Sequence, residues 1–144
     1  MLHSCTNYEC YKGVYSSFNS MNMFEIVHSL LRQFGPENWT LYKGKHLLSF
    51  VDNHDVTRVA SILTNEKHLP LIYALMFGMP GIPCVYYGSE WGAKGEKSQG
   101  DPALRACFDG PQTKRADRVD RKSLLKLKKP LQMPSIMAHS AVLC

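Results

Sequence analysis

Two short apolar runs on either side of a helical segment most strongly constrain how this chain can fold. The runs are 47–51 and 82–87, and each is apolar on both faces, which is typical of a buried parallel strand. Residues 68–77 between them predict a helix, with Pro70 in its first turn and Gly78 at its end. This order predicts βαβ repetition, an α/β fold in which helices cover the outside of a parallel sheet.

A further helix is predicted before the first strand. Its apolar positions lie at helical spacing and are expected to face the core. They are Phe24, Val27, Leu30, Leu31 and Phe34. Asn22 is predicted as the N-cap with Glu25 as its capping partner, and Gly35 should stop the helix. Residues 1–8 are expected to form a short strand.

The formal net charge of +5 is unevenly distributed along the chain. Residues 1–111 carry nine Lys and Arg against ten Asp and Glu, whereas residues 112–144 carry eight against two. The basic character therefore belongs to the last segment. The first 111 residues give no indication of a partner that is a nucleic acid or a membrane surface.

The sequence also indicates where in the cell the protein is expected to reside. No apolar stretch is long enough for a transmembrane helix, and no signal peptide follows Met1. The five cysteines are odd in number and lack CxxC spacing, so free thiols are expected. We expect a cytoplasmic protein, provided that Met1 is the true start.

The polar cluster Asp52-Asn53-His54-Asp55 carries the most chemistry in the chain. It follows the first strand, and the carboxyl ends of strands form the active-site face in parallel barrels. Two interpretations remain open from these residues alone. Either they form a functional site, or Asp and Asn start a turn beside a hydrogen-bonded His54. Asp52 points to the opposite side of the strand from Asn53 and is expected to be structural.

Three segments of the chain resemble the α-amylase family of glycoside hydrolases, the family 13 type. Residues 50–55, Phe-Val-Asp-Asn-His-Asp with Arg58 following, resemble its fourth signature region, at the end of barrel strand seven. Residues 81–90, Gly-Ile-Pro-Cys-Val-Tyr-Tyr-Gly-Ser-Glu, are similar to its strand-eight segment. Residues 6–9, Thr-Asn-Tyr-Glu, are similar to its strand six. The three segments occur in the family's order and spacing.

This resemblance implies the C-terminal part of the catalytic domain: a partial (β/α)8 TIM barrel, approximately strands six to eight with helices six and seven. A whole barrel needs about 250 residues, more than this chain has. Cyclomaltodextrinases, neopullulanases and maltogenic amylases are the most similar types. We divide the chain into a barrel domain, 1–111, and a basic tail, 112–144.

The resemblance also implies roles for individual residues. Asp55 would be the transition-state stabiliser that binds the 2- and 3-hydroxyls of the sugar, and His54 the adjacent hydroxyl ligand. Asn53 is a further substrate-binding candidate. However, we expect Asn53 and Arg58 to support the loop more than to contact the substrate. Trp91 either stacks on a sugar ring or closes the neighbouring loop as an apolar residue.

The implied reaction is retaining hydrolysis of α-1,4 or α-1,6 glucosidic bonds in maltooligosaccharides, cyclodextrins or starch-type glucans. Transferases of the family share the same signature. The family's nucleophile Asp and acid Glu end strands four and five, and would lie before Met1. We therefore expect the chain alone to be inactive. The alternative is a non-catalytic remnant with at most weak sugar binding.

No cofactor is expected. Some members of the family bind calcium, but no metal site can be assigned from this sequence. The expected partner is an α-glucan or maltooligosaccharide, with no nucleic acid and no membrane, and the oligomeric state stays open.

The basic tail departs from the family. Residues 114–122 lack an apolar helical face, whereas codons suited to them, read one base later, give an amphipathic segment. We therefore expect residues 113–144 to be disordered, out-of-frame translation. The competing interpretation is a basic tail for nucleic acid or membranes, but it has no interleaved aromatic residues.

Overall fold

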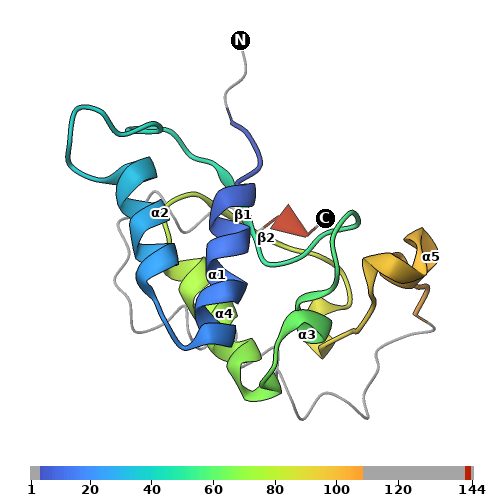
Figure 1. The fold of residues 1–144 in the computed structure, drawn as a ribbon. Helices are drawn as coiled ribbons and strands as arrows, with labels where there is room; N and C mark the ends of the chain where they lie inside the picture. Colours follow the sequence, from blue (N-terminus) through green and yellow to red (C-terminus); the bar gives the residue numbers. More distant parts are fainter. Residues whose placement is uncertain (1–3, 109–141, 144) are drawn as a thin grey trace.

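The computed structural model describes residues 4–108 and 142–143, and its centre is a parallel sheet (Figure 1). Strands lie in the order β1-β2-β3, with bounds β1 Leu48–Phe50, β2 Ile82–Val85 and β3 Val142–Leu143. The predicted strands at 47–51 and 82–87 are confirmed, each slightly shorter than expected. Of the strand expected over residues 1–8, the described residues 4–8 form one parallel bridge, between Thr6 and Leu48, and residues 1–3 lie outside the described residues.

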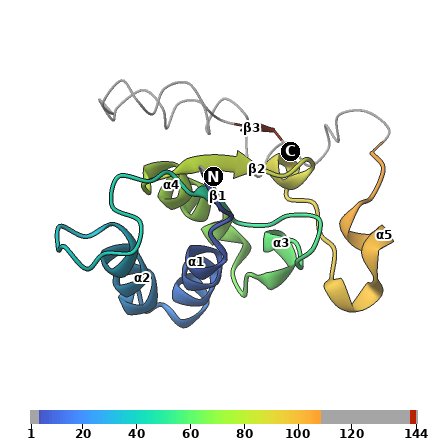
Figure 2. The same ribbon diagram turned by 90° about the horizontal axis from the view of Figure 1, so that it is seen from above.

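The described residues also form helices before β1, between β1 and β2, and after β2. They are α1 Tyr8–Ser20, α2 Phe24–Phe34, α3 Val59–Ile62, α4 Leu69–Gly78 and α5 Asp101–Leu104. Short 3₁₀ turns are η1 Glu66–His68, η2 Ser89–Trp91 and η3 Lys97–Gln99. Figure 2 places α1 and α2 side by side, with α5 at the other end of the molecule. No helix of the described residues is long and apolar enough to cross a membrane.

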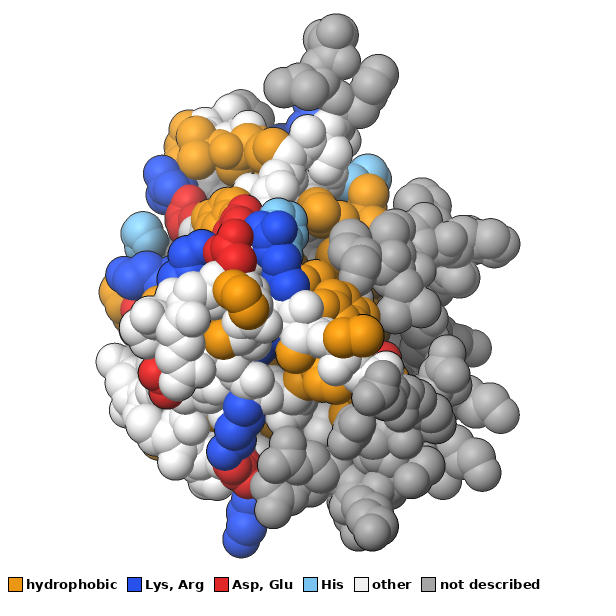
Figure 3. Space-filling view, turned by 90° about the vertical axis from the view of Figure 1, so that its right-hand side faces the viewer, with side chains coloured by type: hydrophobic (Ala, Val, Ile, Leu, Met, Phe, Trp, Pro, Cys, Tyr) orange, Lys and Arg blue, Asp and Glu red, His pale blue; other side chains and the backbone are white. Residues whose placement is uncertain are grey.

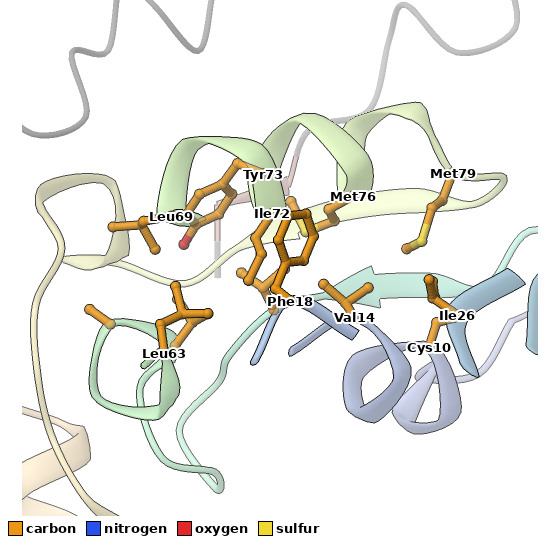
Figure 4. Packing of buried hydrophobic residues seen from close by; sticks show 13 residues of the cluster. Cys10, Val14, Phe18, Ile26, Leu63, Leu69, Ile72, Tyr73, Met76 and Met79 are labelled. Carbon is orange, nitrogen blue, oxygen red and sulfur yellow. The ribbon is translucent and has the colours of Figure 1, made fainter. Parts of the chain in front are cut away.

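Helix α4 confirms the βαβ prediction, because it leads from β1 to the neighbouring parallel strand β2. It begins one residue later than predicted and holds Pro70 in its first turn. The core lies where α4 meets α1, with side chains of both helices pointing toward one another (Figure 4). Its largest fully buried apolar members include Tyr73, Ile72 and Met76 of α4 and Val14 of α1.

Helix α1 was not predicted. It begins after Asn7, whose side-chain oxygen accepts a hydrogen bond of 3.0 Å from the Cys10 amide. Its buried apolar positions, Cys10, Val14 and Phe18, lie four residues apart, which is helical spacing. Its C-terminal half is rich in Ser and Asn, which have low helix propensity, so packing on α2 and α4 stabilises it instead.

The predicted orientation of α2 is wrong at three of its five positions, although Leu30 packs against the core, Phe34 is partly buried and the bounds of the helix are confirmed. The residues that it buries are Ile26, Ser29 and Gln33. Three of the positions expected in the core are exposed, namely Phe24 at 73%, Val27 at 48% and Leu31 at 55%. On the buried face, Ile26 belongs to the core cluster and Leu30 packs against it, whereas Ser29 and Gln33 are polar.

The predicted capping of α2 is also revised. The N-cap is Met23 and not Asn22, although the Asn22 side-chain oxygen accepts from the Phe24 amide at 3.0 Å. Glu25 does not complete a capping box, because its carboxylate accepts from Ser16 at 2.5 Å and pairs with Lys12. The helix ends before Gly35 as predicted; a Cβ there would lie 2.4 Å from the Leu31 carbonyl oxygen.

The basic tail 112–144 lies outside the described residues, apart from β3. There, Val142 pairs with Cys84 and Leu143 with Val85, so β3 is parallel to β2. The domain boundary at 111 and the predicted disorder and out-of-frame origin of the tail stay predictions.

Candidate functional site

His54 and Asp55 lie together beyond the carboxyl end of β1. The His54 Nε2 atom is 3.2 Å from Asp55 Oδ2, and both side chains are about half exposed. Arg105, just after α5, places its Nη2 atom 3.6 Å from Asp55 Oδ1. The same Arg105 nitrogen is 3.4 Å from Asp101 Oδ2. The site therefore presents a solvent-accessible carboxylate between an imidazole and a guanidinium.

Asn53 fixes the loop that carries these two residues. Its side-chain oxygen accepts a hydrogen bond of 2.8 Å from the Asp55 amide, and its side-chain nitrogen donates to the Tyr8 hydroxyl at 3.2 Å. Both ends of the carboxamide are thus used within the protein. This geometry favours the loop-supporting role for Asn53 over contact with a substrate.

Aromatic rings lie next to Asn53 and His54. Tyr8, at the start of α1, is about half exposed and packs edge-on against Phe50 of β1 with 5.0 Å between ring centroids. Tyr86, which follows β2, lies with its ring centroid 6.3 Å from that of His54. Burial raises the pKa of Tyr86, so its phenol stays protonated at neutral pH.

Trp91 lies in η2, where its ring packs edge-on against Phe108 with 5.9 Å between centroids. Within residues 4–108, no described contact joins Trp91 to His54 or Asp55. This packing on Phe108 favours the role of an apolar loop residue for Trp91 over stacking on a sugar ring. The structure thus brings together three of the predicted site residues, His54, Asp55 and Asn53.

Behind the loop, Asp52 is buried and takes no part in the exposed site. One of its oxygens accepts from the Val59 amide at 3.0 Å, and Ser89 Oγ donates to its carboxylate at 2.7 Å. Burial raises the pKa of Asp52, while these hydrogen bonds partly offset the shift. The structural role expected for Asp52 agrees with these contacts.

Two residues at the site were not singled out from the sequence. Tyr8 had a signal in the segment that resembles strand six, and the pairing of Thr6 with Leu48 places the start of α1 beside the end of β1. Arg105 had a local signal, because Asp101 and Arg105 are four residues apart and form an ion pair. Figure 3 views the side of the molecule on which α5 lies, where acidic, basic and histidine side chains adjoin one another.

Two carboxylates of the N-terminal helices, Glu9 and Glu25, are engaged away from Asp55. Glu9 accepts from the Arg32 guanidinium, which lowers the pKa of Glu9, and Glu25 pairs with Lys12. Across the described ranges, no group of three or more His, Cys, Asp or Glu side chains is arranged to hold a metal ion. By itself, the site can accept hydrogen bonds from hydroxyl groups through the Asp55 carboxylate. The His54 imidazole can both donate hydrogen bonds to such hydroxyls and accept them.

Known proteins match this chain in sequence. The model of the alpha amylase catalytic domain matches residues 7–131. The intracellular maltogenic amylase of Bacillus subtilis (strain 168) is 38% identical over 63 residues, which are 43% of this chain and 10% of that protein. The 4-alpha-glucanotransferase of Thermotoga neapolitana is 33% identical over 91 residues, which are 54% of this chain and 20% of that protein.

A solved structure is similar in fold. The cyclic alpha-maltosyl-(1→6)-maltose hydrolase of Arthrobacter globiformis superposes with a TM-score of 0.62 at 21% identity, over 90% of this chain and 30% of that one. The chain's matches span about a tenth to a fifth of the length of these two curated relatives. Because the model of the alpha amylase catalytic domain matches most of the residues of this chain, the chain belongs to the alpha-amylase catalytic-domain family.

Proposed function

We propose that this chain is the part of an α-glucan-acting enzyme that supplies the transition-state-stabilising carboxylate, Asp55, and its neighbouring hydroxyl ligand, His54. The single observation that carries this proposal is their contact of 3.2 Å in an exposed loop at the carboxyl end of a parallel strand. A carboxylate and an imidazole side by side can bind the two vicinal hydroxyls of one sugar ring. Asn53 would hold their loop, and Trp91 would close the next one.

In barrel terms, we propose that the Thr6 bridge, β1 and β2 are strands six, seven and eight. Their parallel order and the helical connections between them support this assignment. Helices α1 and α2 would then together take the place of the barrel's sixth helix, and α4 would be its seventh.

The complete enzyme would cleave α-1,4 or α-1,6 glucosidic bonds in maltooligosaccharides, cyclodextrins or starch-type glucans with retention. Such a reaction needs two carboxyl groups about 5–5.5 Å apart that act as nucleophile and acid. Asp101 is near Asp55, but Arg105 lies between them and pairs with both. Hydrolysis and transfer both remain within the proposal, since the relatives are named as amylases and as glucanotransferases.

A second candidate follows from the same carboxylates: the chain alone is non-catalytic and binds sugar weakly. Glu9 and Glu25 are held by Arg32 and Lys12, so neither is available to Asp55 as a nucleophile or acid. We therefore expect no turnover of maltohexaose by the pure 144-residue chain. Release of shorter sugars by that chain, measured by chromatography, would refute the argument from missing carboxylates.

The binding role of Asp55 can be tested separately by titrating the chain with maltohexaose. Asp55→Asn should weaken binding, whereas Glu37→Gln, which alters an exposed carboxylate in the loop before β1, should leave it unchanged. The ion pairs of Asp55 are half exposed, and Glu37 is exposed. The free energy of unfolding of each variant should therefore lie within about 0.5 kcal/mol of that of the parent chain. Equal binding by all three proteins would contradict the proposed site.

We also propose a cytoplasmic location, which the name of the intracellular Bacillus subtilis relative supports. Fractionation of the source cells should recover the chain with a cytosolic marker enzyme. Recovery from the culture medium would contradict this location.

A further inference from the structure

Arg58 is the largest fully buried side chain of the described residues, with 1% of its surface exposed. Its Nε and Nη2 atoms both donate to the carbonyl oxygen of Leu104, at 3.1 and 2.7 Å. Its Nη1 atom donates to the Tyr87 carbonyl oxygen at 2.7 Å and to Ser89 Oγ at 3.2 Å. One guanidinium thus binds the segment after β2 and the end of α5 at the same time.

The same guanidinium also touches the wall of the exposed site. Its carbon atom lies 4.1 Å from the centroid of the Tyr86 ring, which in turn faces His54. Within residues 4–108, Arg58 itself forms no hydrogen bond or ion pair with Asp55. Any influence of Arg58 on the site must therefore pass through the groups that it binds.

Helix α5 depends on such anchoring. A helix of four residues is far below the length that is stable alone. Its anchors are the buried Leu104 side chain, the Leu104 carbonyl held by Arg58, and a close approach to Gly95. A Cβ on Gly95 would lie only 2.2 Å from the Ala103 carbonyl oxygen, so this approach requires glycine.

We propose that Arg58 is a positioning residue for the site: by fixing the Leu104 carbonyl it places the adjacent Arg105 against Asp55. The peptide that Arg58 holds is the one that joins Leu104 to Arg105, so a shift there moves the Arg105 side chain directly. Arg105 then bridges Asp55 and Asp101, and so orients the exposed carboxylate. This inference rests on the role proposed for Asp55 but can be measured without sugar.

The test uses the ¹³C resonance of the Asp55 side-chain carboxyl in the full chain. Arg105→Gln removes the ion pair and should shift this resonance. Arg58→Lys keeps the charge but cannot donate in the planar geometry that Leu104 and Tyr87 require. It should therefore shift the resonance in the same direction, and the double variant should match Arg105→Gln alone. An unchanged resonance in Arg58→Lys, or shifts that add in the double variant, would overturn the proposal.

Two further variants separate positioning from stability. Val14→Ala weakens the core near α1 and should leave the Asp55 resonance in place; a shift equal to that of Arg58→Lys would mean a merely structural effect. Gly95→Ala should push residues 103–105 away from Arg58 and reproduce the shift. If Arg58→Lys does not fold, an unchanged resonance in Gly95→Ala overturns the proposal.

Maltohexaose titration of the same proteins tests the link to binding. Arg58→Lys and Arg105→Gln should each weaken binding about tenfold, the size of one charge-assisted hydrogen bond, and not more when combined. If the parent chain binds no maltohexaose, the proposed function fails while the carboxyl resonance still decides the role of Arg58.

Discussion

Gly13 of α1 faces Ile26 of α2 so closely that a Cβ added to Gly13 would lie 3.3 Å from the Ile26 Cα atom. The contact also brings Ser17 Oγ to 3.3 Å from the Ile26 amide, from which it accepts a hydrogen bond. At the other end of the same seam, Gln33 and Asn7 exchange hydrogen bonds of 2.8 and 3.1 Å. Buried polar groups and one glycine therefore join the two helices beside Ile26, whose side chain belongs to the hydrophobic core cluster.

The first prediction concerns this glycine. Gly13→Val should lower the free energy of unfolding by about 1–3 kcal/mol, because its branched side chain would overpack the seam. Gly78→Ala is the matched control at the end of α4, where nothing lies within 4 Å of the added Cβ. It should be neutral or stabilise by up to about 1 kcal/mol. Equal losses in the two variants, measured by urea unfolding, would contradict the close helix contact.

The failure to predict how α2 is oriented follows from the same seam. Periodicity identified the helix and its end at Gly35, because both signals are local. The face that α2 buries depends on what α1 presents to it, and α1 was not foreseen. Its Gly13 and Ser17 contact the Ile26 backbone, and its N-cap Asn7 bonds the buried Gln33, which no hydrophobic pattern can indicate.

A pair of substitutions on α2 tests which face is buried. Ile26→Ala should cost about 2–5 kcal/mol, as expected for a fully buried aliphatic residue. Leu31→Gln, on the exposed face, should change the free energy of unfolding by no more than about 0.5 kcal/mol. The second variant should also be more soluble, because it shortens the exposed apolar face of α2. A larger loss from Leu31→Gln than from Ile26→Ala would restore the orientation that periodicity predicted.

At the site, local order alone left two interpretations open. The polar cluster directly follows a strand, where active-site residues lie in parallel barrels, but the roles of His54 and Asp55 were implied by the resemblance to the α-amylase family. Arg105 comes from a segment fifty residues later, and its approach to Asp55 depends on Leu104 being held by Arg58. Such long-range anchoring has no periodic signal in one sequence.

The origin of the basic tail is a question for the coding DNA. We expect a frame-checked read to contain an insertion or deletion near codon 113, since the charge rises sharply there. The family match continues to residue 131, so it includes part of this segment and does not mark the boundary itself. Clean DNA without an indel would refute the out-of-frame origin and leave a basic tail to be explained.

The buried thiol of Cys10 makes stability sensitive to alkaline pH. Burial raises the pKa of Cys10 from 9.0 to about 11, and its side chain is only 1% exposed. In the unfolded chain the thiol therefore ionises first, so its contribution is complete below about pH 9 and is lost as the pH rises toward 11. Burial also raises the pKa of Tyr11 and of Tyr73, which adds a loss of the same sign at higher pH.

We therefore expect the urea midpoint of the parent chain to fall steeply between pH 9 and 11, and Cys10→Ala to flatten this fall while lowering stability at neutral pH. Cys107→Ala removes an exposed thiol and is the matched control, which should keep the parent's slope. The comparison isolates the thiol, because the two tyrosines are present in all three proteins. Equal slopes for the parent and Cys10→Ala would mean that Cys10 reaches solvent before the chain unfolds.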